Sequence, residues 1–374
     1  MSPDAAPAAR PGRYAGPERR QVPPPAYDGP ERRAIPDPTG LDRGRSSGLD
    51  GLRAFAAILV VGFHLNTVSG VSFGPLDPIV RGGDSGVYLF FALSGYLLYK
   101  PFVRGPVDLV DYAARRSGRI LPGYFVALLG LTLLTGSRLP LEHPIPFLAV
   151  ASSYDIDLRG FLGNAWTLSA EILFYATLPL LARVSRGREV AVLVALGVAS
   201  ALLAVVHRAT YTHETAWLIG TYPLVFYAFV PGMLLAILEL RHPTRFELLR
   251  GWPSLALGVG LVVVGALTTI LPVSIATGIG TVLLMGWLRH HDVPGARALA
   301  FVGGASYALY LWHKDVFIAF GPVVGLGVAV VASALSWALV ERPILARVHA
   351  AVARRRIMLP GPPVPVPAPP FTAP

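Results

Sequence analysis

Long apolar segments, separated by short polar stretches, run through almost the whole chain after residue 48. A helix rises about 1.5 Å per residue, so about 20 apolar residues can cross the hydrocarbon layer of a bilayer. The pattern therefore predicts an all-α polytopic membrane protein with about ten transmembrane helices. The proline-rich stretch 140–150 is expected to be a re-entrant or interfacial segment instead. The predicted spans are residues 50–68, 86–103, 120–135, 165–182, 189–206, 217–238, 253–271, 272–288, 299–318 and 322–341.

The basic residues between these segments predict the orientation of the chain. If the N-terminus is cytoplasmic, most arginine and lysine residues fall in the inside loops. Cytoplasmic loops of membrane proteins are enriched in these residues, so we predict that both termini are cytoplasmic. The outside loops then hold only Arg81, Arg138, Arg159 and Arg208.

Composition agrees with a membrane protein, because 53% of the residues are hydrophobic and only 14% are charged. The formal net charge is +10, but the basic residues lie in short clusters between apolar segments rather than on an aromatic and basic face. We therefore expect the lipid bilayer, and not nucleic acid, as the partner of this charge. The chain has no cysteine, which excludes disulfides, thiolate metal sites and cysteine nucleophiles.

Both ends of the chain have a different composition. Residues 1–48 are rich in proline and arginine, and residues 344–374 are basic and then rich in proline. Such segments bury too little apolar surface to fold, so we expect both tails to be disordered. The first tail repeats the motif Tyr-x-Gly-Pro-Glu-Arg-Arg at residues 14–20 and 27–33. The repeats are interpreted either as a docking motif for a partner or as a basic segment attracted to anionic lipids.

The first apolar segment contains an arginine, Arg53, and a histidine, His64. A charge in the membrane costs roughly 2.5–3.5 kcal/mol, so such residues usually face a protein interior or a wet cavity. At about 100° and 1.5 Å per residue, the two side chains share one helix face and lie about 16 Å apart. Both can therefore line one cavity, with Arg53 near the inner membrane face and His64 near the outer one.

The predicted topology separates the other polar residues into two layers. Glu171 and His313 share the outer layer with His64, and a carboxylate there can orient an imidazole that activates a hydroxyl as general base. Arginines in the inner layer are suited to a phosphate-bearing donor, because guanidinium groups bind phosphate bidentately. Together they predict group transfer from a cytoplasmic phosphorylated donor to an outward-facing acceptor. The inner layer holds Arg53, Arg115, Arg116 and Arg119.

Each of these residues also has a structural interpretation. A histidine near a helix end can be an interfacial residue, basic clusters can be topology anchors, and Glu171 can pair with a neighbouring helix. His313, beside Lys314, is compatible with a structural role near the interface. The stretch His290-His291-Asp292 is not expected to bind a metal, because consecutive residues in a basic loop are a weak ligand pattern.

Six segments in order resemble the motifs of the bacterial acyltransferase 3 family of integral-membrane O-acyltransferases. The resemblance assigns residues 49–343 to a transmembrane acyltransferase domain and leaves both tails outside it. The first segment reads Leu-Asp-Gly-Leu-Arg-Ala and continues to His64. Tyr88 stands where family members often carry an acidic residue. The segments are 49–64, 86–97, 115–122, 166–175, 306–313 and 341–343.

The resemblance implies an acyl-CoA donor, commonly acetyl-CoA, and a hydroxyl acceptor on a cell-surface glycan, a lipid-linked sugar or a secondary metabolite. It implies location in the bacterial cytoplasmic membrane and no permanently bound cofactor. His64 is the expected base or acyl-handling group, Glu171 its partner, and the four inner arginines the donor-binding residues. Further motif positions are Ser94, Trp166, Tyr307 and His313.

Two other classes of protein, a transporter and a sensor, are alternatives to the acyltransferase interpretation. A polytopic transporter also uses intramembrane arginine, histidine and glutamate, as a proton or substrate relay. The two halves of this chain show no convincing internal repeat, which transporters commonly have. A catalytically idle sensor that docks through its N-terminal repeats would not need both Arg53 and His64. The acyltransferase is therefore the favoured interpretation.

Overall fold

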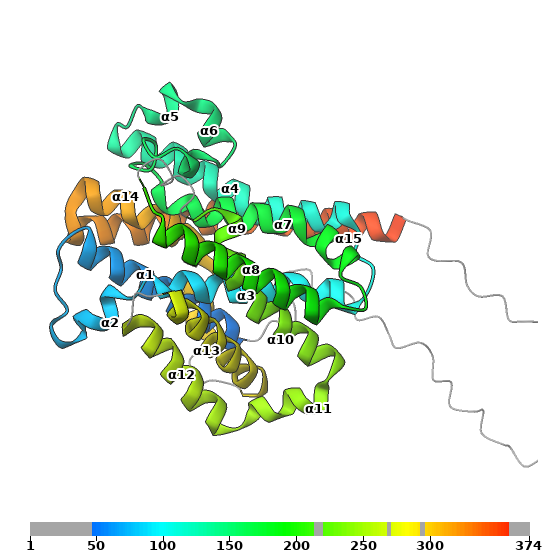
Figure 1. Cartoon of the computed structure of the whole chain (residues 1–374). Helices are drawn as coiled ribbons and strands as arrows, with labels where there is room; N and C mark the ends of the chain where they lie inside the picture. The colour runs from blue at the N-terminus through cyan, green and yellow to red at the C-terminus, as the bar shows by residue number, and fades with distance from the viewer. Residues whose placement is uncertain (1–46, 213–219, 268–270, 292–295, 359–374) are drawn as a thin grey trace, which may run out of the picture. The chain divides into compact units, whose positions relative to one another are not determined.

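The computed structural model describes residues 47–212, 220–267, 271–291 and 296–358, and every regular element within these ranges is a helix (Figure 1). The long helices are α1 (Ser47–Thr67), α3 (Ser85–Arg104), α4 (Leu109–Thr135), α7 (Trp166–Val184), α8 (Glu189–Ala209), α10 (Val230–Arg241), α12 (Trp252–Leu267), α13 (Leu271–His290), α14 (Ala296–Leu335) and α15 (Arg342–Met358). The short α-helices are α2 (Asp77–Arg81), α5 (Leu139–Glu142), α6 (Pro144–Leu148), α9 (Tyr222–Val225) and α11 (Pro243–Phe246). The remaining turns are η1 (Gly74–Leu76), η2 (Ser152–Tyr154), η3 (Gly163–Ala165), η5 (Phe226–Ala228), η6 (Glu247–Arg250) and the π-helix η7 (Ser336–Glu341).

The described residues confirm an all-α fold, and several of the helices are candidates to span a membrane. Six helices are long and apolar enough to cross a bilayer, or up to eight if two bent helix pairs each count as one span, within the described residues. Helix α14 is broken at Gly321, which has a φ of 73°, and the break falls between the last two predicted spans. The count of ten and the cytoplasmic placement of both termini stay predictions.

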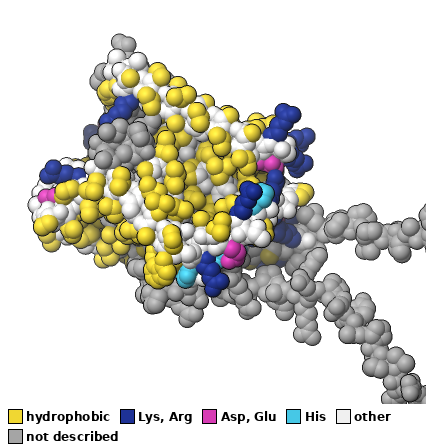
Figure 2. Space-filling view, turned by 60° about the horizontal axis from the view of Figure 1, so that its bottom comes forward, with side chains coloured by type: hydrophobic (Ala, Val, Ile, Leu, Met, Phe, Trp, Pro, Cys, Tyr) yellow, Lys and Arg dark blue, Asp and Glu magenta, His cyan; other side chains and the backbone are white. Residues whose placement is uncertain are grey.

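The surface of the helices is apolar where a soluble protein would be polar. Figure 2 shows hydrophobic side chains over the middle of one face, with lysine and arginine side chains toward its edges. Large hydrophobic side chains of α4, α8 and α14 stay exposed, for example Leu133 at 74% and Val323 at 84%. Helices that present apolar side chains outward are expected to face lipid. The proline-rich stretch 140–150 forms the short helices α5 and α6 rather than a span.

Helices α4 and α15 differ from the sequence prediction. Helix α4 begins well before residue 120, because the Asp108 side chain caps it by accepting hydrogen bonds from the N–H groups of Val110 and Asp111. The tail from residue 344 is not disordered throughout, since α15 continues to Met358. Arg355 and Arg356 donate to Asp111 at 2.8 and 2.6 Å, so α15 packs along α4 (Figure 1). Residues 359–374 and the tail 1–46 lie outside the described residues.

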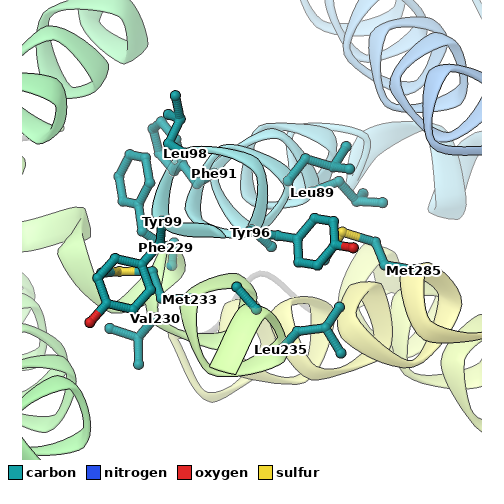
Figure 3. Packing of buried hydrophobic residues seen from close by; sticks show 14 of the residues in the cluster. Leu89, Phe91, Tyr96, Leu98, Tyr99, Phe229, Val230, Met233, Leu235 and Met285 are labelled. Atoms are coloured by element: carbon teal, nitrogen blue, oxygen red, sulfur yellow. The ribbon is translucent and has the colours of Figure 1, made fainter. Parts of the chain in front are cut away.

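Close backbone contact holds the core together. A side chain at Gly95 of α3 would collide with the Phe229 carbonyl, and one at Gly232 of α10 with the carbonyl of Ala92. Small residues at crossings of membrane helices permit this approach. Figure 3 shows Tyr96 of α3 reaching from this crossing toward α13. Helix α3 is thereby fixed between α10 and α13, with α1 on another side.

Candidate active site

Helices α1 and α14 lie side by side and run in the same direction. Gly303 of α14 packs so closely on the Asp50 backbone that an added Cβ atom would lie 2.4 Å from the Asp50 oxygen. Farther along both helices, His313 meets His64. The pair therefore has two ends, which we call the arginine end, around Asp50, Arg53 and Gly303, and the histidine end, around His64 and His313.

At the histidine end the two imidazole rings are in direct contact. His313 Nε2 lies 3.0 Å from His64 Nδ1, and the ring centroids are 4.9 Å apart. His313 is fully buried, and its Nδ1 lies 2.9 Å from the carbonyl oxygen of Leu309. His64 Nδ1 is also 3.0 Å from the carbonyl oxygen of Val60.

These contacts assign the proton positions of the neutral rings. The Leu309 carbonyl can only accept, so His313 carries its proton on Nδ1 and leaves Nε2 as an acceptor. His64 Nδ1 then donates to His313 Nε2 and to the Val60 carbonyl. The second nitrogen of His64, Nε2, keeps its lone pair and is suited to take a proton.

His64 lines a cavity of about 170 Å³. Aromatic rings form much of the wall, and Tyr88 stacks on Tyr227 behind it at a centroid distance of 6.3 Å. Two charged side chains of opposite sign, Asp84 and Lys314, complete the lining. Such a mixture of apolar surface with a few polar groups is typical of a small-molecule site. The lining residues are Val60, Phe63, His64, Asp84, Val87, Tyr88, Gly163, Asn164, Trp166, Tyr310 and Lys314.

One wall of the cavity is a loop held on α14. Leu162 is buried with a φ of 50°, a conformation uncommon for leucine, and its N–H group donates to Asp315 Oδ1 at 3.0 Å. The Asn164 amide donates to the carbonyl of Tyr310, whose hydroxyl donates to the Asn164 carbonyl at 2.9 Å. These bonds fix Trp166, the first residue of α7, against the cavity.

Asp84 lines the same cavity as His64 and lies directly before α3. Its removal from part of the surrounding water raises the pKa of its carboxyl, against the opposing effect of a hydrogen bond from the Ser85 N–H group. The carboxyl therefore ionises at higher pH than an ordinary aspartate. A group that titrates beside His64 can make activity depend on pH.

Glu171 contacts other residues than the histidines that the sequence predicts as its neighbours. Its Oε1 accepts hydrogen bonds from Ser94 of α3 at 2.7 Å and from Tyr175 at 2.5 Å. Within the described residues no hydrogen bond links it to His64 or His313. Glu171 instead lies near Tyr307 and Tyr310. These tyrosines lie on successive turns of α14, between the arginine end and the histidine end of the α1–α14 pair.

The arginine end contains charged groups with long contacts. Arg53 Nη1 lies 3.4 Å from Asp50 Oδ1. Arg119 Nη2 donates to the Gly304 carbonyl at 3.4 Å, so a residue of α4 reaches the same turn of α14 that packs on α1. Arg115 and Arg116 are half-buried on the preceding turn of α4. The helical rise from Gly304 to His313 is about 14 Å, so the two ends are well separated.

The structure thus brings His64 to His313, and Arg119 to the turn beside Asp50. It assigns the other predicted residues local partners: Tyr307 donates to the Ile120 carbonyl at 2.9 Å, and Trp166 lies edge-on to Phe91. His290 packs on Phe246, and His291 stacks on Trp287. Asp292 lies outside the described residues.

Sequence reasoning gave no role to Asp84, Asn164 or Asp315, and it named Glu341 only as the first residue of the motif segment 341–343. An outer loop without a recognisable motif supplies Asn164, and nothing in the chain shows that it meets α14. Asp315 and Glu341 offered a signal, since each is an acidic residue in or beside an apolar segment and therefore costly to bury unpaired.

Similarity to known proteins identifies the family of this chain. Residues 46–341 match the acyltransferase domain of the acyltransferase 3 family. The exopolysaccharide production protein ExoZ of Rhizobium meliloti (strain 1021) is 28% identical over 305 residues, which cover 71% of this chain and 90% of that protein. Nodulation protein 10 of Rhizobium leguminosarum bv. viciae is 28% identical over 72% of this chain and 84% of its own length.

A third relative, the O-acetyl transferase of Shigella phage Sf6, is 26% identical over 81% of this chain and 97% of its own length. No solved structure matches the chain. The family match covers most of the sequence, including both ends of the α1–α14 pair. The chain therefore belongs to the acyltransferase 3 family of membrane O-acyltransferases.

Proposed function

We propose that this protein transfers an acyl group, in the first instance acetyl, from acyl-CoA at the cytoplasmic side of the bacterial cytoplasmic membrane to an acceptor hydroxyl. The acceptor classes are a cell-surface glycan, a lipid-linked sugar and a hydroxylated secondary metabolite. The observation that carries the proposal is the contact between His64 and His313, because it leaves His64 Nε2 as a base beside a cavity. Two of the relatives support this proposal, because one is named for exopolysaccharide production and another for O-acetyl transfer.

In the proposed donor site, the phosphates of acyl-CoA bind the arginine end through Arg53 and Arg119, with Arg115 and Arg116 nearby. Guanidinium groups keep their charge and bind phosphate with two parallel hydrogen bonds, which suits this role. The thioester then extends along α1 and α14 toward His64. Glu171, between the two ends, is proposed as a proton partner on this path.

In the proposed reaction, His64 Nε2 takes the proton of the acceptor hydroxyl while the oxygen attacks the thioester carbonyl. The C–S bond breaks, and the proton on His64 passes to the departing CoA thiolate. His313 acts as a positioning residue that holds the His64 ring through Nδ1. A second route acylates His64 first, and a trapped acyl-enzyme with ping-pong kinetics would identify that route.

Release of free CoA from acetyl-CoA by the detergent-purified protein tests the proposal. The assay adds a panel of hydroxylated acceptors and compares wild type with His64→Ala. We expect acceptor-dependent release that disappears in the variant. Release that survives in His64→Ala would refute the role of His64, and solute movement in liposomes without any CoA release would indicate a transporter.

A further inference from the structure

A buried carboxylate lies at the arginine end without a full set of hydrogen bonds. Glu341 ends the π-helix η7, and its side chain is 2% exposed. Ser336 donates to its Oε1 at 2.9 Å, whereas its Oε2 has no hydrogen-bond partner within the described part of the chain. A buried unpaired carboxylate is costly, so such a group calls for an explanation.

Glu341 forms an ion pair with Arg119, whose Nη1 lies 3.9 Å from Glu341 Oε2. The Arg119 guanidinium also lies 5.2 Å from the centre of the Trp337 ring and 5.8 Å from that of Tyr307. Gly123 of α4 permits this arrangement, since an added Cβ atom would lie 2.9 Å from the Glu341 carboxyl carbon. Glu341 therefore attracts Arg119 from one side without making a short hydrogen bond to it.

We propose that Glu341 is a positioning residue that holds Arg119 in place for the phosphates of the donor. The inference rests on the proposed function, because it takes acyl-CoA as the ligand of Arg119. A guanidinium has five N–H groups, so it can face a carboxylate on one edge and a phosphate on another. The carboxylate cannot lose Arg119 without being left unpaired, which restricts the movement of the arginine.

The positioning role of Glu341 and a purely electrostatic role predict opposite effects of Glu341→Gln on CoA binding. Glu341→Gln keeps the shape of the side chain and an oxygen for the Ser336 hydroxyl but removes the negative charge. A site that attracts phosphate only through its net charge would then bind CoA more tightly. A positioning role predicts weaker binding, because Arg119 loses the carboxylate that attracts it.

The experiment measures equilibrium binding of CoA and of pantetheine, which lacks the nucleotide phosphates, to purified full-length protein. We expect Arg119→Gln to weaken CoA binding by roughly thirtyfold and Glu341→Gln by about fivefold, with pantetheine binding unchanged. The double variant should bind CoA no more weakly than Arg119→Gln alone, because Glu341 acts through Arg119. Ser336→Ala, which removes the hydrogen bond that orients Glu341, should show a smaller loss in the same direction.

Glu239→Gln is the matched control, because it makes the same change in a half-buried carboxylate bonded to Lys100 at 2.6 Å and Arg289 at 3.1 Å. It should lower thermal stability and leave the ratio of CoA to pantetheine affinity unchanged. Equal or tighter CoA binding by Glu341→Gln, or full additivity in the double variant, would overturn the positioning role. A wild-type protein that binds no CoA would overturn the donor assignment itself, and the two failures are therefore distinguishable.

Discussion

At the histidine end of the α1–α14 pair, two imidazoles meet at 3.0 Å, and backbone carbonyls fix their Nδ1 protons. Two ion pairs at the arginine end are longer, at 3.4 Å for Arg53 with Asp50 and 3.9 Å for Arg119 with Glu341. Short, directional bonds define the position and tautomer of a catalytic base, whereas a guanidinium that already faces a carboxylate keeps further N–H groups that can donate to an anion. This difference supports the proposed division of labour, with proton transfer at one end and donor binding at the other.

The largest effect is expected at the histidine end. His313→Leu removes the acceptor for His64 Nδ1–H and should lower kcat by roughly 10²–10⁴-fold, with little change in the KM for acyl-CoA. His313→Gln keeps a side-chain oxygen that can accept this proton, so it should recover part of the activity. Steady-state kinetics of the folded variants check this, and equal loss in both variants would argue against a specific orienting bond.

At the arginine end, the expected change is in affinity rather than in rate. Arg53→Gln should raise the KM for acyl-CoA by roughly tenfold to a hundredfold and change kcat much less, because a charged hydrogen bond to the donor is lost. Arg53→Lys keeps the charge but not the bidentate geometry, so it should fall between wild type and Arg53→Gln. A lower kcat with an unchanged KM in Arg53→Gln would contradict the separation of donor binding from proton transfer.

The sequence predicted the residues that α1 contributes to the arginine and histidine ends, but not the partner of His64. Helix positions followed from apolar length, and the 3.6-residue period placed Arg53 and His64 on one face of α1. The partner of His64 could not be read in this way, because the contact with His313 joins residues from opposite ends of the chain. Helix α15 was not predicted for the same reason, since the ion pairs that join it to α4 link Arg355 and Arg356 to the sequence-distant Asp108 and Asp111.

Glu171 gives a sharper test of what connects the two ends. Glu171→Gln should lower kcat by about tenfold without loss of folded protein, because it removes the charge that accepts from Ser94 and Tyr175. Ser94→Ala removes only one of these donors and should have a smaller effect. Unchanged turnover in Glu171→Gln, with thermal stability as the control, would remove Glu171 from the mechanism.

The smallest effect concerns pH and Asp84. Because the pKa of its carboxyl is raised in the folded state, the folded protein holds this proton more tightly than the unfolded chain. Asp84 therefore reduces stability progressively as pH rises from its ordinary pKa through the raised one. Asp84→Asn should melt slightly higher than wild type at neutral pH and at the same temperature as wild type in acid. Thermal denaturation in detergent at several pH values checks the sign, and a lower melting temperature at neutral pH would contradict it.

The most direct test of the division of labour is the equilibrium affinity of acetyl-CoA for His64→Ala, measured beside its turnover. If the arginine end binds the donor and His64 supplies the base, the variant should bind acetyl-CoA within about twofold of wild type while turnover is lost. An affinity that falls as far as the turnover would show that His64 is needed to bind the donor, and it would contradict the separation of the two ends.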